Sequence, residues 1–420
     1  MMRASQPCRT PSPLTVETVL RIDDVAEIAD DWRALETQHP GAGFFQSHDW
    51  CVYIWRTRAA EAASRKIEHR VLVVRDAGRI VALWPLSIRT DAWGRFAHDL
   101  GEPFGQYSDI LMARGCDPDA ILELACMELS NWRIDGLVLR KVRVDSPLHP
   151  WLDRTGTPIG STEHAPAIDL GAAGGHDAYR GSLSSKTRKN LRNYRNRLGR
   201  AGRILHHAIT APAERAGAIE RCFDGRTAWL AASGLSSTAF ADPAFGAVVD
   251  GLTHGDRGAP PVIAMRLGLE PHDPMPADAT LDLSLHWGFE HQGRYYAYMA
   301  WKNPAFDDYS PGRLHLEDVV ATAANRGMST IDLLVPAMPY KTSVANSAVE
   351  VHAFGVSFSA RGRLVIKGWH GLLRPRLKSA LLAMSPQTRR LLLDGPRTLR
   401  ATINRWRARR GLRPKPQPAQ

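Results

Sequence analysis

The fold of this chain is decided by residues 295–341, which read YYAYMAWKNPAFDDYSPGRLHLEDVVATAANRGMSTIDLLVPAMPYK. The aromatic run at the start of this stretch is typical of a strand, because aromatic residues are enriched in strands. An amphipathic helix is predicted from Ser310 to Gly327, and the apolar run over residues 331–335 is typical of a buried strand. A strand, a helix and a second strand in this order predict a βαβ crossover.

The start of this helix predicts an anion-binding site. Ser310 suits the N-cap position, Pro311 suits the first helical position, and Gly312 leaves the backbone amides uncovered. Free amides and the helix dipole both favour a phosphate, and Arg313 would add a cationic partner. The same residues can serve helix capping alone. Because open α/β sheets bind ligands at the carboxyl ends of their strands, where this helix begins, a phosphate-bearing cofactor is the first hypothesis.

The positive charge of the chain is confined to two segments. The net charge is +11, yet residues 361–420 alone hold 16 Lys and Arg with one acid, Asp394. Residues 186–203 hold eight basic residues and no acid, so the rest of the chain carries a net charge of −12. This distribution argues against a broad nucleic-acid groove, which needs basic residues spread over one surface.

Several classes of protein are excluded by simple counts. The five cysteines are scattered and form no Cys-x-x-Cys pair, so we expect neither a disulfide framework nor a metal site. No apolar run reaches the roughly 20 residues that a membrane-spanning helix requires. Residues 1–14 lack the apolar core of a secretory signal, which predicts a cytoplasmic location.

The remaining sequence predicts an α/β chain with two similar halves. In the first half, β-rich runs on either side of residues 76–79 predict a hairpin, and residues 119–132 predict a helix. In the second half, we expect helices over residues 182–198 and 213–233, and a second hairpin over residues 281–301. Both halves therefore have the same predicted order of elements, which is helices, a hairpin, a loop, a helix and a strand.

We expect three parts along the chain. The N-terminal domain covers residues 1–170, the second domain covers residues 175–365, and a basic helical tail covers residues 366–420. Residues 349–358 and 364–367 are predicted to be closing strands of the second domain.

Three polar residues are candidates for catalysis. His286 lies on an apolar strand, where it is either a core histidine with satisfied nitrogens or a base that points into the site. Asp332 and Lys341 bracket the end of the crossover, where they form an ion pair or turn contact, or else orient a substrate. The residue types alone leave these alternatives open.

Four features together resemble the GNAT acyltransferase superfamily. They are the basic helix over residues 184–198, the hairpin that ends at Tyr298, the turn over residues 309–312 with the long helix that follows it, and the closing segment from Asp332 to Lys341. The chain is most similar to the CelD-like branch, which is associated with cellulose and exopolysaccharide biosynthesis.

The resemblance covers residues 40–355 and implies an α/β (α+β) fold. Two tandem GNAT-like mixed sheets would be flanked by helices, as in the FemAB aminoacyl transferases, with a basic helical tail outside the resemblance. The implied cofactor is acetyl-CoA or another acyl-CoA. Its pyrophosphate would lie at residues 310–313, and its pantetheine would lie beside Tyr298 and Trp301 as an added β-edge. The phosphate loop of this chain is poorer in glycine than the common GNAT loop.

The resemblance also implies direct transfer of an acyl group to an amine or hydroxyl of a small-molecule or saccharide acceptor. A base removes the proton of the acceptor, and a backbone amide stabilises the oxyanion of the thioester. No glutamate stands where the usual base would be, so His286, Asp307 and Asp332 are the candidates.

Two other functions stay open. A FemAB-like transferase would use aminoacyl-tRNA and bind the RNA backbone through the basic helix, whereas an accessory protein of a polysaccharide synthase complex would have no catalytic activity. Residues 370–410 alternate Leu-rich and Arg-rich positions. They predict either peripheral contact with an anionic membrane at its inner face or packing of this segment on the body of the protein.

Overall fold

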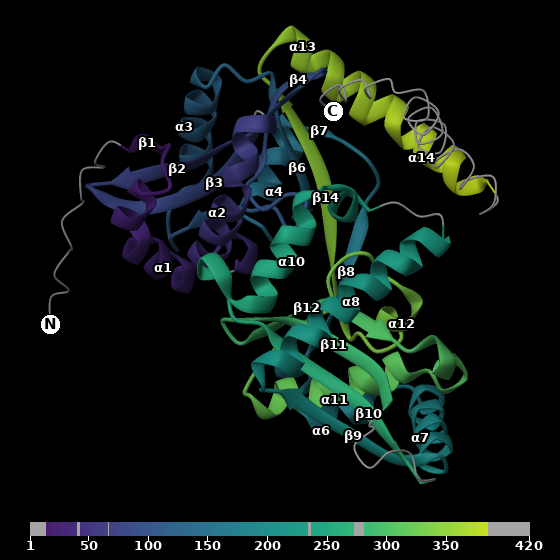
Figure 1. Ribbon diagram of the computed structural model, residues 1–420. Helices are drawn as coiled ribbons and strands as arrows, with labels where there is room; N and C mark the ends of the chain where they lie inside the picture. Colours follow the sequence, from purple (N-terminus) through teal and green to yellow (C-terminus); the bar gives the residue numbers. More distant parts are fainter. Residues whose placement is uncertain (1–13, 40–42, 66, 234–236, 273–280, 385–420) are drawn as a thin grey trace, which may run out of the picture.

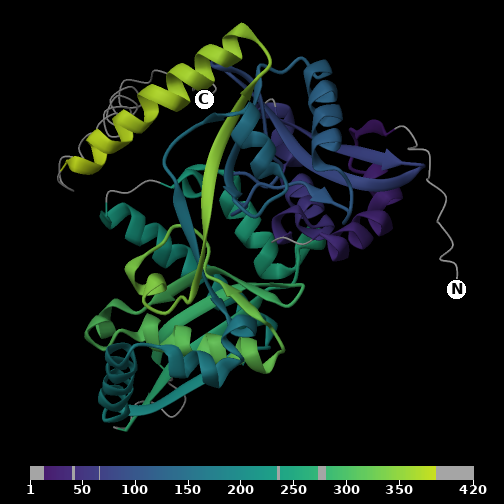
Figure 2. The same ribbon diagram turned by 180° about the vertical axis from the view of Figure 1, so that it is seen from behind.

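A mixed β-sheet of fourteen strands runs through the residues that the computed structural model describes, which are 14–39, 43–65, 67–233, 237–272 and 281–384. The strand order is β1-β2-β3-β4-β6-β14-β8-β13-β12-β11-β10-β9, with β5 beside β3 and β7 beside β14. Figures 1 and 2 show two lobes, purple to blue and teal to green, with helices around each part of the sheet. The predicted α/β fold with two tandem mixed sheets is confirmed, and the two sheets are joined edge to edge.

The N-terminal lobe contains the predicted hairpin and helix. Its strands are β1 (Thr15–Val19), β2 (Ile67–Asp76), β3 (Arg79–Asp91), β4 (Gly94–Asp99), β5 (Leu111–Met112), β6 (Gly136–Arg143) and β7 (Thr157–Pro158). Its helices are α1 (Ala29–Gln38), α2 (His48–Arg65), α3 (Pro118–Asn131) and α4 (Leu148–Thr155). Helix α3 begins as its sequence predicts, because the side chain of Asp117 accepts hydrogen bonds from the first amides and Pro118 follows it.

The C-terminal lobe contains the crossover that the opening stretch predicts. Its strands are β8 (Glu163–Asp169), β9 (Gly202–Ile209), β10 (Ile263–Pro271), β11 (Leu281–His291), β12 (Arg294–Lys302) and β13 (Thr330–Asp332). Its helices are α5 (Leu170–Ala173), α6 (His176–Ser182), α7 (Ser185–Gly199), α8 (Pro212–Ser233), α9 (Thr238–Ala241), α10 (Ala244–His254), α11 (Pro311–Asn325) and α12 (Pro339–Thr342). Strands β12 and β13 are parallel neighbours in the sheet, and α11 connects them along the chain, so the βαβ crossover is confirmed.

Two strands link the lobes across the boundary expected near residue 170. Strand β8 pairs with β13 of the C-terminal lobe. Strand β14 (Ser347–Ser357) pairs with β8 on one side and with β6 of the N-terminal lobe on the other. Figures 1 and 2 both show β14 as a long strand that runs from one lobe to the other. The sheet is therefore continuous through the whole molecule.

The helices of the crossover region cover opposite faces of the C-terminal sheet. Helix α11 packs its apolar stripe with Tyr295, and its stripe consists of Leu316, Val319, Val320 and Ala323. Helix α8 packs on the other face with Trp287 and Tyr296, in a core that also contains Phe44 and Trp50 of the N-terminal lobe. Because this core is shared, the rings of Phe44 and Phe289 stack with their centroids 4.4 Å apart.

The predicted strand over residues 364–367 is wrong. This run belongs to a π-helix over Leu364–Leu373, which follows α13 (Ala360–Arg363) and continues into α14 (Arg374–Ala383). Strand β14 already has partners on both edges, so its edges offer the run no place in the sheet. The run instead places Ile366 against the glycines of β6 and β14.

The predicted tail helices are only partly covered by the structure. Helix α14 lies within the predicted helical tail over residues 366–420, and residues 385–420 lie outside the described residues. Among the helices that are described, none is long and apolar enough to cross a bilayer.

Candidate active site

Strands β12 and β13 separate soon after their first pairs. They are in register from Arg294↔Thr330 to Tyr296↔Asp332 and have no further pairs, whereas β12 stays paired with β11 as far as Lys302. Over residues 297–302, one edge of β12 therefore has no strand partner among the described residues. Such an edge can accept an extended ligand by β-strand addition.

A tight turn directs the chain away from β12. Leu334 has a φ of 59°, a left-handed conformation that is uncommon for a bulky residue. Its N–H donates to Oδ1 of Asp332 at 2.9 Å, and its carbonyl accepts from Nζ of Lys341 at 2.9 Å. The structure thus brings two of the predicted catalytic residues together, and both of them hold the turn that opens the two strands.

Asp332 is also the meeting point of the two lobes. Its carboxylate accepts from the hydroxyl of Tyr107 at 2.8 Å and from Nη1 of Arg143 at 3.3 Å, both in the N-terminal lobe. Nη1 of Arg294 lies 3.6 Å away. Because Asp332 is fully buried and already accepts these bonds, its position supports a structural task rather than that of a base that meets the acceptor.

Strand β12 carries a β-bulge opposite Gly288. Trp287 pairs with Met299 and Phe289 pairs with Tyr296, so β12 has one residue more than β11 between these pairs. A bulge leaves one residue outside the ladder, and bulges are frequent next to active sites. Tyr298 lies in this bulge, and its hydroxyl donates to the carbonyl of Phe104 in the N-terminal lobe at 2.9 Å.

His286 lies on β11 under helix α11, where it is buried. Its Nδ1 is 3.0 Å from the hydroxyl of Tyr295. Burial, with the charge of Lys341, lowers the pKa of His286 to about 4, so the ring is neutral near pH 7. A neutral, oriented imidazole can accept a proton, as the sequence hypothesis requires.

Two further histidines surround His286, and the sequence analysis did not single them out. The ring of His315 on α11 lies 6.0 Å from that of His286 and 5.5 Å from that of His206 on β9, measured between centroids. Both nitrogens of His315 are buried without a hydrogen-bond partner among the described residues, and burial lowers its pKa. His315 lies between Leu314 and Leu316, so its sequence context indicates only a core position.

The start of α11 differs from the predicted cap. The side chain of Ser310 makes no capping hydrogen bond, because the residue is in the left-handed region with a φ of 48°. Its carbonyl accepts instead from the amides of Arg313 and Leu314. Pro311 occupies the first helical turn as predicted, and Gly312 faces Lys302 at the end of β12, so the helix starts beside the free edge of that strand.

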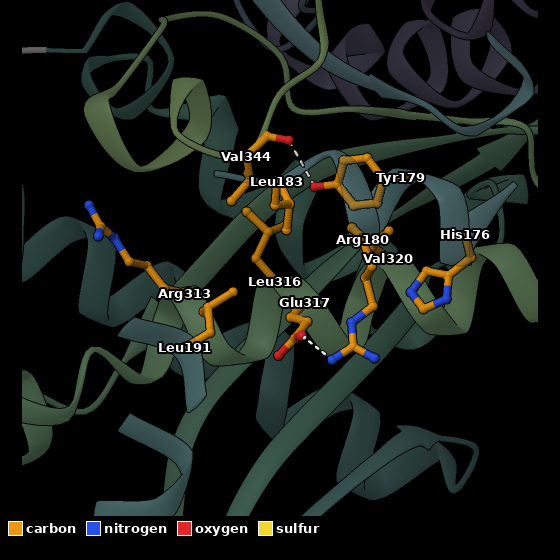
Figure 3. Close-up of a pocket in the computed structure, with 10 residues that line it drawn as sticks. All are labelled: His176, Tyr179, Arg180, Leu183, Leu191, Arg313, Leu316, Glu317, Val320 and Val344. Atoms are coloured by element: carbon orange, nitrogen blue, oxygen red, sulfur yellow. Dashed lines mark hydrogen bonds and ion pairs between the residues drawn. The ribbon is translucent and has the colours of Figure 1, made fainter. Parts of the chain in front are cut away.

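A packing seam fixes α11 against α6 and α7 (Figure 3). The hydroxyl of Tyr179 donates to the carbonyl of Val344 at 2.8 Å, and Arg180 pairs with Glu317 at 3.1 Å. The cavity left in this seam is only about 10 Å³, which is too small for a cofactor. Arg313 borders the seam, and Figure 3 shows its guanidinium pointing away from the ion pair.

Two other predicted residues do not contribute to the group around His286. Asp307 is exposed and pairs with Lys302 at 2.6 Å, on the surface beside the start of α11. Trp301 borders a cavity of about 450 Å³ on the α8 face of the sheet. Arg221, Arg266 and Asp282 form ion pairs in the wall of this cavity.

Comparison with known proteins gives one family match and a likeness in fold. The model of the acetyltransferase (GNAT) domain family matches residues 185–342, from the start of α7 to the end of α12. This stretch of the chain is similar to a GNAT acyltransferase domain. In its fold, the chain is similar to the crystal structure of FemX, with a TM-score of 0.58 and 11% identity over 83% of this chain and 98% of the other.

A tandem GNAT protein from the clavulanic acid biosynthesis pathway aligns with a TM-score of 0.42 and 12% identity, over 82% of this chain and 99% of the other. None of the curated proteins matches the chain. The GNAT assignment therefore depends on the family match, and the likeness to FemX supports the fold of the whole chain.

Proposed function

We propose that this GNAT domain uses an acyl-CoA and transfers its acyl group to an amine or hydroxyl of an acceptor. The observation that carries the proposal is the separation of β12 from β13 after Tyr296. The pantetheine would add to the free edge of β12 over residues 297–302, and the pyrophosphate would bind where Gly312 faces Lys302.

The chemistry proposed for this site uses the bulge and the buried histidine. The acceptor attacks the thioester carbonyl, the C–S bond breaks, and CoA leaves as a thiolate. An amide at the bulge that contains Tyr298 would donate to the oxyanion, because the bulge frees a backbone group from the ladder. His286, neutral and oriented by Tyr295, would take the proton of the acceptor.

We propose that the 450 Å³ cavity on the α8 face holds the part of the acceptor that does not react. The reacting amine or hydroxyl would pass the opening between β12 and β13 to reach His286, which lies on the α11 face. Trp301 offers an aromatic wall, and the ion pairs of Asp282 offer polar groups, a combination that suits a sugar-like acceptor. An acceptor from cellulose or exopolysaccharide biosynthesis, which the CelD-like resemblance implies, has this chemistry.

Titration calorimetry of the full chain with acetyl-CoA tests the cofactor proposal. We expect saturable binding by the native protein, and at least a tenfold loss in Gly312→Trp because the indole would fill the space of the pyrophosphate. Gly312→Ala is the matched control, since a Cβ there meets nothing closer than Cβ of Lys302 at 3.9 Å. No binding by the native protein would reject the acyl-CoA, and native-like binding by Gly312→Trp would reject the phosphate site.

One observation favours the alternative of aminoacyl-tRNA. Among the described residues, Lys186, Lys189 and Arg192 of α7 have no ion-pair partner, whereas Arg195 pairs with Asp318 at 2.8 Å. If these three side chains bind an RNA backbone, tRNA binding should weaken steeply with salt and be lost in the triple Gln variant. If acyl-CoA is the donor, the same variant should bind acetyl-CoA like the native protein.

A further inference from the structure

The N-terminal lobe holds a second group of charged side chains, which the proposed acyl transfer does not use. They surround the loop over residues 100–107 and come from four strands and one helix. We call them the basic cluster: His69, Arg89, His98, Arg140 and Lys141 of the sheet, with Arg58 of α2.

The backbone places these side chains together. In the sheet, His69 pairs with Ser87 and Ser87 pairs with His98, so the two histidines lie in one row across β2, β3 and β4. Strand β6 then bulges, because Leu139 pairs with Phe354 but Val142 pairs with His352. The bulge contains Arg140 and Lys141.

Both residues of this bulge are aimed at the loop over residues 100–107. Lys141 has a left-handed φ of 59°, and its Nζ donates to the carbonyl of Gly105 at 3.2 Å. Nη1 of Arg140 lies 3.7 Å from the carboxylate of Glu102. Bulges that redirect side chains in this way are frequent beside functional sites.

The negative charges of the described residues do not balance the cluster. Glu102 lies between His98 and Arg140, at 3.6 and 3.7 Å, and Asp242 pairs with Arg58 at 3.0 Å. Glu163 acts on Lys141 as a third acid. Three arginines and one lysine therefore face three carboxylates.

A fourth carboxyl does not remove the excess of positive charge. Burial raises the pKa of Asp99 to about 8, so this group is mainly protonated near pH 7. Burial and the neighbouring Arg58 lower the pKa of Arg89, as expected for a cation that lacks sufficient counter-charge.

The guanidinium groups also have unused donors. Nε and Nη1 of Arg58, Nε of Arg89 and Nε of Arg140 are buried with no hydrogen-bond partner among the described residues. Arg58 is only 2% exposed. Water could accept these hydrogen bonds, but it would leave the excess charge in place, whereas an anion satisfies both.

We propose that the basic cluster binds the phosphate group of a small molecule. A phosphate has more acceptor oxygens than a carboxylate. It can therefore accept more of the hydrogen bonds from the four unused donors on the three guanidinium groups. The site is coupled to the bulge of β12 through Phe104, because Arg58 lies over the Phe104 ring at 5.1 Å and Tyr298 donates to the Phe104 carbonyl. An occupied site would therefore hold the loop that supports Tyr298.

Calorimetry and thermal unfolding of the full chain test this site at constant ionic strength. We expect saturable binding of inorganic phosphate or pyrophosphate with a raised Tm, and no effect of acetate at the same concentration. A stronger response to pyrophosphate than to phosphate would indicate a ligand with a diphosphate group. Equal responses to the two anions would indicate a ligand with a single phosphate group. Equal stabilisation by acetate, or none by either phosphate, would overturn the proposal.

Two matched variants locate the response. Arg89→Gln should bind phosphate at least tenfold more weakly, whereas Arg114→Gln, the same change at an exposed arginine of this lobe, should respond like the native protein. Equal responses of the two variants would reject the basic cluster. Gly312→Trp should keep the response, which separates this site from the proposed acyl-CoA site.

Hydrogen exchange of the native protein needs no variant and covers the case in which Arg89→Gln does not fold. Phosphate should slow exchange of the amides in residues 100–107. Protection at the start of α11 with none in this loop would contradict the proposal.

Discussion

At the scale of single residues, Asp332 is a predicted catalytic residue that has a structural role. It lies within the apolar run over residues 331–335 and could serve as a catalytic base on sequence grounds alone. In the structure it binds Tyr107, Arg143 and the amide of Leu334, so it holds both the lobe contact and the turn beside the proposed cofactor.

Replacing Asp332 by Asn should therefore destabilise the whole protein. We expect a loss of about 3 kcal/mol in the free energy of unfolding, because a buried arginine loses part of its counter-charge, although Arg143 keeps Asp145. Urea unfolding measures this loss. Asp307→Asn, which breaks an exposed pair with Lys302, is the control and should cost no more than about 1 kcal/mol. Equal effects of the two changes would contradict the structural task of Asp332.

His286 should make the protein sensitive to acid. Its pKa is about 4 in the folded state against 6.5 ordinarily, so the unfolded state binds the proton first as the pH falls. Stability should then be complete above pH 6.5 and decrease by up to about 3 kcal/mol towards pH 4. His286→Gln should make this part of the curve less steep, as measured by urea midpoints at each pH, because His291, whose pKa burial also lowers to about 4, keeps its own contribution. His254→Gln, at an exposed histidine, should leave the curve unchanged.

At the scale of elements, the helical segment over residues 364–373 shows how neighbours override an apolar run. Ile366 is fully buried. A Cβ added to Gly136 or Gly355 would lie only 2.9 or 2.5 Å from the nearest atom of its side chain. The two glycines therefore allow this segment to pack on strands β6 and β14, whose edges are already paired.

Ile366→Ala should loosen this segment from the sheet. We expect a loss of about 2–5 kcal/mol in the free energy of unfolding, since a cavity would remain against two glycines that cannot fill it. Leu364→Ala, two residues away and 73% exposed, should change stability by no more than about 0.5 kcal/mol. A similar loss in both variants, measured by chemical unfolding, would show that Ile366 does not anchor the segment.

At the scale of the whole molecule, the two lobes share a sheet and a core. Strand β14 is paired in both lobes, and Phe44 of the first lobe stacks on Phe289 of the second. We therefore expect a single unfolding transition, with the same midpoint by circular dichroism and by tryptophan fluorescence. Trp84 and Trp287 report on different lobes, so two separate midpoints would show that the lobes unfold independently.

The crossover, the two hairpins and the α/β class can be predicted from the sequence alone, because each depends on local periodicity and turn chemistry. The helix from Pro311 and the hairpin of β11 and β12 are where the pattern predicts them. The basic helix, the second hairpin, the turn before the long helix and the segment from Asp332 to Lys341 together suggest the GNAT resemblance, which the family match over residues 185–342 supports.

The contacts between polar residues, in contrast, depend on the tertiary fold. Asp332 lies 189 positions from Arg143 along the chain, and His286 finds Tyr295 through strand register. The tertiary fold also determines that Leu334 turns away from β12 and that Ile366 belongs to a helix. These outcomes depend on which edges and cavities remain open after the strands have paired, and distant segments set that condition, so no local pattern of residues contains it.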